Sequence, residues 1–188
     1  MPLLRYFPLV LACAVTLILQ TLSSAEFPIT YGRSAILAGD WWRVLFGGWV
    51  HHNIIHLVMN LLALCLIWAL LSRYRTHWCC LLLLGCHVVM VDLALLAISP
   101  TTEYYWGLSG ALHGLFALAA LDLIVHREGQ GWWWLLGLLA KLLWDSVQTD
   151  SWTSELIATR VHVGSHWLGA ASGIIIGLLL ISWQRWNK

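Results

Sequence analysis

A serine and two histidines are spaced for nucleophilic chemistry. The segment GLSGALHGL (107–115) places Ser109 between two glycines, with His113 four residues later and His166 near the start of the last apolar segment. A serine hydroxyl becomes a nucleophile when a histidine nitrogen accepts its proton. A side chain four residues along the same helix stacks along the helix axis, so a base from another helix has better access to the hydroxyl. We therefore favour His166 over His113 as the base.

A second set of polar residues suits the stabilisation of negative charge. His56 and Asn60 are four residues apart and lie on one face of a helix. Their side chains, with the backbone N–H of Ser109, are candidate donors to the oxyanion of a tetrahedral intermediate. Gly107 and Gly110 would leave room for a substrate carbonyl. The structural alternative is that His56 and Asn60 only form hydrogen bonds between helices.

The composition indicates which elements hold these residues. The chain has 188 residues, of which 60% are hydrophobic and 10% charged, with 14 tryptophans. A soluble domain carries far more charge, so we expect an integral membrane protein. Six apolar segments approach the ~20 residues that cross a bilayer as a helix; they are residues 6–22, 54–72, 78–98, 107–125, 132–148 and 164–183. The prediction is an all-α, polytopic bundle of six transmembrane helices.

The six segments account for nearly the whole chain, so we expect a single domain over residues 1–188. The first segment follows Arg5 and ends in small residues, as a signal peptide does, but we expect it to be retained as a span. Residues 23–53 form the longest connection. This loop carries Trp41, Trp42 and Trp49, which favours a location in the membrane interface.

The basic residues predict the orientation of the bundle. With the N-terminus inside, the inner segments carry Arg5, Arg73, Arg75, Arg127, Arg185 and Lys188, and the outer segments carry Arg33, Arg43 and Arg160. This bias favours N-in and C-in. Ser109, His56, Asn60 and His166 then lie within ~10 Å of the outer face, at 1.5 Å per helical residue. The net charge of +1 gives no indication of a nucleic-acid partner.

Among the remaining charged residues are carboxylates that are candidates for a third catalytic residue beside the serine and the histidine. Asp122 is excluded, because it lies about 20 Å deeper than Ser109 on nearly the opposite helix face. Asp145 and Asp92 lie nearer the outer ends of their segments, so either is able to approach the site. We favour the simpler interpretation that Lys141 and Asp145, four residues apart, pair with each other.

Two further patterns indicate packing. Gly169, Gly173 and Gly177 are spaced by four residues, which allows a neighbouring helix to approach closely. The five cysteines form no C-x-x-C pair and lie in or beside apolar segments, so we expect neither a disulfide framework nor a metal site.

Three motifs, taken in order, resemble the rhomboid intramembrane serine proteases. They are WWRVLFGGWVHHNIIHLVMN (41–60), GLSG (107–110) and HWLGAASG (166–173). The resemblance implies Ser109 as nucleophile and His166 as general base. It also implies an oxyanion hole of His56, Asn60 and backbone N–H near Ser109, and it places Trp42 and Arg43 in the interfacial first loop. His51, Gly107 and Gly110 belong to the matching motifs.

One position departs from the common pattern. Many rhomboids carry an aromatic residue one turn after the serine that stacks on the base, and this chain has His113. GLSGALHG is similar to the rhombosortase branch, which implies His113 as a supporting residue near the base. The branch also implies exported substrates with a C-terminal Gly-Gly motif, membrane anchor and basic tail, and a bacterial inner membrane as the location.

Other functions are compatible with parts of the sequence. Histidines on facing helices are able to hold haem in a membrane electron carrier; the candidates are His52, His56, His87, His113 and His166. That hypothesis leaves GLSG and Asn60 without a role. A zinc metalloprotease lacks its H-E-x-x-H motif. A catalytically inactive rhomboid relative that acts as a binding protein is a further alternative. For the protease no cofactor or metal is expected.

Overall fold

The computed structural model describes residues 2–148 and 152–187. Its long helices coincide with the six apolar segments; they are α1 (Phe7–Leu22), α4 (Ile54–Leu71), α5 (His77–Ile98), α6 (Ser109–Val125), α7 (Gln130–Val147) and α9 (Val163–Trp186). The short elements are η1 (Pro2–Tyr6), β1 (Tyr31–Gly32), α2 (Arg33–Leu37), α3 (Arg43–Phe46), η2 (Gly47–Trp49), β2 (Tyr104–Tyr105) and α8 (Trp152–Ile157).

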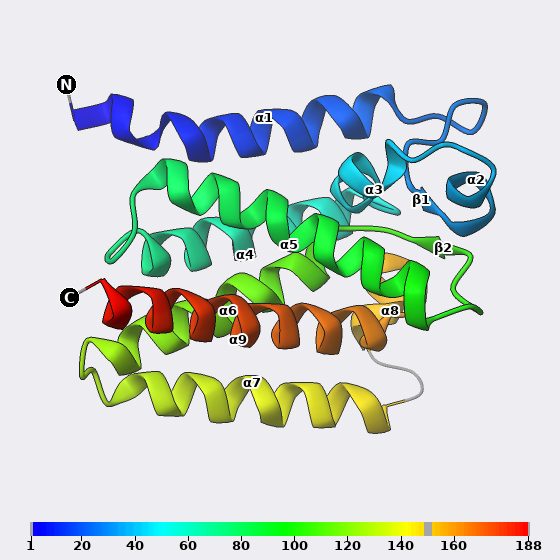
Figure 1. Cartoon of the computed structure of the whole chain (residues 1–188). Coiled ribbons are helices and arrows are strands. Elements are labelled where there is room, and N and C mark those ends of the chain that lie inside the picture. Colours follow the sequence, from blue (N-terminus) through cyan, green and yellow to red (C-terminus); the bar gives the residue numbers. More distant parts are fainter. Residues whose placement is uncertain (1, 149–151, 188) are drawn as a thin grey trace.

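Helix α6 is the centre of the bundle. It packs against α4, α5, α7 and most extensively α9. Its side chains Leu115, Leu118 and Leu123 are fully buried. The long helices run side by side, and the short elements α2, α3, α8, β1 and β2 gather at one end, on the right of Figure 1. Helix α1 begins and α9 ends at the opposite end, so both lie on the same side of the bundle (Figure 1).

Four of the described helices are long and apolar enough to cross a membrane: α1 with part of η1, α4, α5 and α9 up to Trp183. Helix α6 is apolar but has only 17 residues. Helix α7 has 18 residues and is not among the four. The mostly helical membrane fold is therefore confirmed, and the number of six transmembrane helices remains a prediction.

Side chains that accept hydrogen bonds from the first turn fix where three long helices begin. The Asn53 carboxamide accepts from the backbone N–H of His56 at 2.8 Å at the start of α4. The Thr76 hydroxyl accepts from Cys79 at 3.2 Å at the start of α5. At the start of α9, His162 Nδ1 accepts from Ser165 at 3.0 Å. Each contact satisfies an amide that has no partner within its helix.

The first loop is folded onto the bundle. Strand β1 pairs with β2 in antiparallel register, Tyr31 opposite Tyr105 and Gly32 opposite Tyr104. Arg43 is buried; it donates to the carbonyls of Pro28 and Thr30 and forms a 3.1 Å ion pair with Asp40. The loop of residues 23–53 is thus attached to the segment that leads directly into α6.

Glycines bring α6 and α9 into backbone contact. A Cβ on Gly169 would lie 1.8 Å from the carbonyl oxygen of Gly110, and one on Gly173 would lie 2.1 Å from that of Gly114. Both distances are far below any real contact, so only glycine fits at these positions. The predicted packing face of the last span is confirmed, and it brings the start of α9 against the start of α6.

Candidate active site

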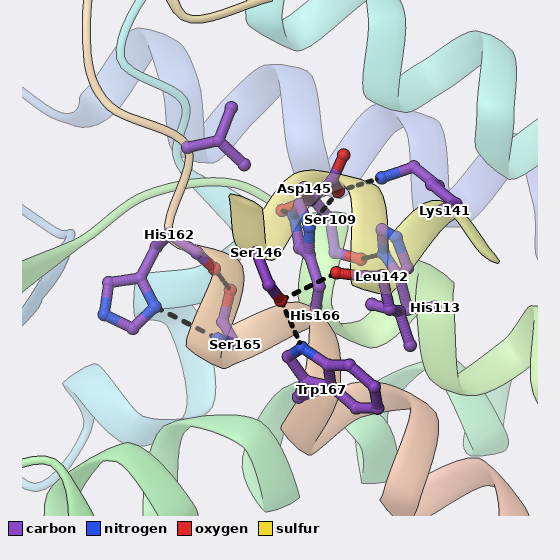
Figure 2. A network of polar contacts seen from close by, with 12 residues as sticks. Ser109, His113, Lys141, Leu142, Asp145, Ser146, His162, Ser165, His166 and Trp167 are labelled. Carbon is purple, nitrogen blue, oxygen red and sulfur yellow. Dashed lines mark hydrogen bonds and ion pairs between the residues drawn. The ribbon is translucent and has the colours of Figure 1, made fainter. Parts of the chain in front are cut away.

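Ser109 and His166 meet at the contact between α6 and α9. Ser109 is the first residue of α6, and His166 lies in the first turn of α9 with only 5% of its surface exposed. His166 Nε2 lies 3.0 Å from Ser109 Oγ (Figure 2). In this geometry an unprotonated Nε2 accepts the hydroxyl proton, which is the arrangement of a nucleophile with its base.

His113 faces a different atom of the serine. Its Nδ1 lies 2.6 Å from the backbone carbonyl oxygen of Ser109, and because a carbonyl only accepts, Nδ1 carries the proton. The His113 ring stacks on the His166 ring, with centroids 4.1 Å apart and planes inclined by 13°. The hydrogen bond of His113 is thus to the Ser109 backbone, and its ring packs on the ring of His166.

His56 and Asn60 lie beside this pair. Both side chains are buried, and both line the same cavity as Ser109 and His166. The Asn60 amide donates one hydrogen bond to the backbone carbonyl of His56 at 2.9 Å, which leaves its second N–H available. As the first helical residue, Ser109 has a backbone N–H without a partner inside α6.

The two glycines of the GLSG segment are needed for protein packing. Gly107 has φ of +93°, which favours glycine, and a Cβ there would lie 2.7 Å from the His56 ring. A Cβ on Gly110 would lie 2.9 Å from both the Ser165 carbonyl oxygen and the Tyr105 hydroxyl. Protein atoms thus occupy the Cβ side of both glycines, and the expectation that they leave room for a substrate carbonyl remains a prediction.

Tyr105 is a site residue that the sequence reasoning missed. Its hydroxyl accepts a hydrogen bond from the backbone N–H of Gly110, the residue after Ser109, at 3.0 Å. Burial raises the pKa of the Tyr105 hydroxyl, which keeps it protonated. Because Gly110 N–H is engaged, it is not a free oxyanion donor. Tyr105 lies four residues before α6, and no sequence pattern predicts that a tyrosine at this position accepts a hydrogen bond from the second amide of the helix. The sequence therefore gave little indication of this contact.

His51 supports the turn that precedes Ser109. It is 2% exposed, and its Nε2 accepts from the Leu108 backbone N–H at a long 3.5 Å. Gln20 of α1 bonds both backbone groups of His51, at 2.7 and 3.1 Å. Burial, aided by the neighbouring His56, lowers the pKa of His51 from 6.5 to about 3. His51 is therefore neutral in the folded protein.

Acidification is expected to destabilise the protein through His51. The unfolded chain takes up a proton near pH 6.5, whereas folded His51 resists protonation down to about pH 3. The contribution of neutral His51 is complete above pH 6.5 and is lost as the pH falls, by about 2 kcal/mol at pH 5. Unfolding in detergent at pH 7.5 and pH 5 measures it. His51→Gln retains an acceptor for Leu108 and should show a shallower pH dependence; an identical dependence would contradict the assignment.

Asp145 reaches the site from α7. Its Oδ2 lies 3.4 Å from His166 Nδ1, and the same carboxylate pairs with Lys141 (Figure 2). The predicted pairing of Lys141 with Asp145 is confirmed, and the alternative that Asp145 approaches the site also holds. This contact depends on how α7 is rotated about its own axis relative to α9, and the sequence does not predict that rotation.

The other carboxylates lie elsewhere. Asp92 is fully buried against η2, where a Cβ on Gly48 would lie 3.7 Å from both of its oxygens. Asp122 forms two 2.6 Å hydrogen bonds with Arg75, as expected of a residue far from Ser109. His87, at the α5–α9 contact, lies 2.8 Å from the Ser172 hydroxyl.

A cavity of about 1230 Å³ opens in front of Ser109. Helices α4, α6, α7, α8 and α9 contribute its lining, which includes the aromatic side chains of Trp106, Trp134 and Trp144. A mixed lining of aromatic and a few converging polar groups is typical of a ligand site. Ser109 and His166 both line this cavity, so a ligand bound there would lie beside them.

The same residues offer ligands to a metal ion. One atom each from His113, Asp145 and His166 lies within 4.8 Å of the others. However, the two rings are stacked nearly parallel, so their nitrogens do not converge on one point, and the Lys141 ammonium already binds the carboxylate. Because the two rings are stacked, their nitrogens do not face each other from opposite sides of a haem iron, so this pair does not fit haem ligation. The arrangement fits proton transfer better than metal or haem binding.

Fold and site together define a helical membrane protein with a serine and a histidine in hydrogen-bond contact where two central helices begin. The family model of the Rhomboid domain matches residues 38–183, most of the chain. The chain belongs to the rhomboid family, whose activity is in general intramembrane proteolysis, although inactive members exist. A comparison with curated proteins gave no significant match.

Proposed function

We propose that the chain is an intramembrane serine protease that uses Ser109 as nucleophile and His166 as general base. The observation that carries the proposal is the 3.0 Å contact between Ser109 Oγ and His166 Nε2. Inactive relatives usually lack one of the two residues, and this chain has both. The rhomboid domain match supports the same activity.

The geometry supports the following reaction. Ser109 Oγ attacks the substrate carbonyl as its proton passes to His166 Nε2, which forms a tetrahedral oxyanion. The Ser109 N–H, the second Asn60 N–H and the His56 ring are the donors proposed for that oxyanion. The intermediate collapses to an acyl-enzyme as His166 returns the proton to the leaving amine. Water from the outer face then hydrolyses the ester by the same steps, and Ser109 is regenerated.

Covalent labelling tests the assignment. A fluorophosphonate is expected to form an adduct with purified protein, and peptide mass spectrometry should locate it on Ser109. An adduct on another residue, or none on protein that shows a cooperative unfolding transition, would sink the proposal.

The finer assignment is to the rhombosortase branch. It is supported by His113, which replaces the usual aromatic residue and stacks on His166 in its place. We propose a bacterial inner-membrane protease of six spans, N-in and C-in, that forms one domain over residues 1–188. Its substrates would be exported proteins with a C-terminal Gly-Gly motif, an anchor and a basic tail.

A reporter protein that carries such a tail tests the branch. Co-expression should release the reporter from the membrane, and replacement of both glycines by valine should abolish release. Equal cleavage of both reporters would refute the branch and leave the protease assignment intact.

A further inference from the structure

We propose that Asp145 is the positioning residue of a Ser109–His166–Asp145 triad. The inference rests on the proposed protease function and extends it from two residues to three. Rhomboid resemblance supplies only the serine and the histidine, so the argument depends on the contacts of α7 with α9.

The base has an unsatisfied nitrogen on the side away from Ser109. His166 Nδ1 is buried and forms no hydrogen bond with any described residue. The Asp145 Oδ2 atom lies 3.4 Å away, at ion-pair distance but without hydrogen-bond alignment. Figure 2 shows the two side chains directed toward each other from α7 and α9. A small rotation of Asp145 would convert the contact into a hydrogen bond.

The chemistry requires a proton on that nitrogen. His166 Nε2 must be bare to accept from the Ser109 hydroxyl, so in neutral His166 the proton is on Nδ1. A buried N–H without an acceptor costs about 1–3 kcal/mol. The Asp145 carboxylate removes this cost by accepting a hydrogen bond from His166 Nδ1–H. It thereby favours the tautomer of His166 in which Nε2 is unprotonated and able to act as base.

The carboxylate has a second effect during the reaction. When Ser109 attacks, its proton moves to Nε2 and His166 becomes an imidazolium with a proton on each nitrogen. The negative charge of Asp145 then stabilises that cation until Nε2 gives the proton to the leaving amine. Asp145 neither gains nor loses a proton in this cycle.

Lys141 holds the carboxylate in place. It precedes Asp145 by one helical turn and pairs with the same oxygen, Oδ2, that faces His166. The Asp145 side chain is 21% exposed and lines the cavity. In soluble serine proteases the triad carboxylate is buried, and its replacement lowers kcat by about 10⁴-fold. Asp145 is paired with Lys141 and exposed to the cavity, so we expect it to contribute less to the reaction rate.

A purely structural role is the alternative to test against. Asp145 could serve only to hold α7 against α9, as its neighbour Ser146 does. The Ser146 hydroxyl accepts a 3.0 Å hydrogen bond from Trp167 Nε1 of α9 (Figure 2) and forms no hydrogen bond with His166 among the described residues. Ser146→Ala is therefore a matched control that breaks an adjacent α7–α9 contact.

The experiment measures the rate constant of fluorophosphonate inactivation, kinact, separately from the half-saturation concentration KI. Asp145→Asn is expected to lower kinact about tenfold to 100-fold and to change KI less than about twofold. Ser146→Ala should leave both within about twofold. For Asp145→Ala, added formate should restore part of kinact, because the anion is able to enter the cavity and take the position of the carboxylate.

Three results would overturn the triad. They are an unchanged kinact in Asp145→Asn, an equal fall in Asp145→Asn and Ser146→Ala, or folded Asp145→Ala that shows no response to formate. The formate test serves alone if Asp145→Asn does not fold. Failure of the wild-type protein to form an adduct on Ser109 would instead refute the protease function itself, so the two failures are distinguishable.

Discussion

Ser109→Ala is expected to abolish fluorophosphonate labelling and to lower cleavage of a membrane-anchored reporter by at least about 10⁴-fold. The Ser109 hydroxyl lies 3.0 Å from His166 Nε2, so this variant removes the proposed nucleophile from its base. Removal of one oxygen atom at a half-buried position should leave the unfolding transition nearly unchanged.

His166→Ala is the companion variant and should reduce labelling by about the same factor. Loss of either member of a unit that acts together costs nearly as much as loss of both, so Ser109→Ala with His166→Ala should be no worse than either alone. Additive losses, or a His166→Ala variant that labels at the wild-type rate, would contradict the assignment of the base.

Gly169→Ala is expected to destabilise the protein by about 3 kcal/mol or more. The added Cβ would lie 1.8 Å from the Gly110 carbonyl oxygen and 2.6 Å from its carbon, and neither backbone atom is able to rotate away. The helices α6 and α9 must separate, which also moves His166 away from Ser109. Activity and stability should therefore fall together, as measured by labelling and by denaturant titration in detergent.

Gly85→Ala is the control for this change. Gly85 lies in α5, and a Cβ there would meet no atom within 4 Å. Since alanine favours a helix over glycine by roughly 1 kcal/mol, this variant should be as stable as the wild type or slightly more so. A Gly169→Ala protein as stable as Gly85→Ala would show that α6 and α9 do not approach each other this closely.

The sequence was sufficient to predict the long helices and the proximity of Ser109 to His166. Apolar segments indicated the long helices within a few residues, because the hydrophobic length of a span is imposed by the bilayer. The glycine spacing indicated which face of α9 packs closely. Ser109 and His166 both lie at the starts of helices that begin on the same side, so placing them at one depth required only the order of the segments.

The remaining contacts depend on geometry that composition does not encode. Asp145 reaches His166 only because α7 has a particular rotation and tilt, whereas its spacing from Lys141 is visible in the sequence. The two-residue pairing of β1 with β2 is too short to give an alternating pattern. The packing of His56 against Gly107 and of Tyr105 against Gly110 is likewise not visible in the sequence.

The short length of α6 has a consequence for the surrounding lipid. Seventeen residues span about 25 Å, some 5 Å less than a typical hydrocarbon core of about 30 Å. In the proposed arrangement of six spans, either the bilayer thins around the protein, or one end of α6 lies below the surface in a water-accessible depression. Because Ser109 is the first residue of this helix, hydrophobic mismatch would then set how near the proposed nucleophile lies to bulk water, and the thickness of the host membrane would become a determinant of the proposed hydrolysis.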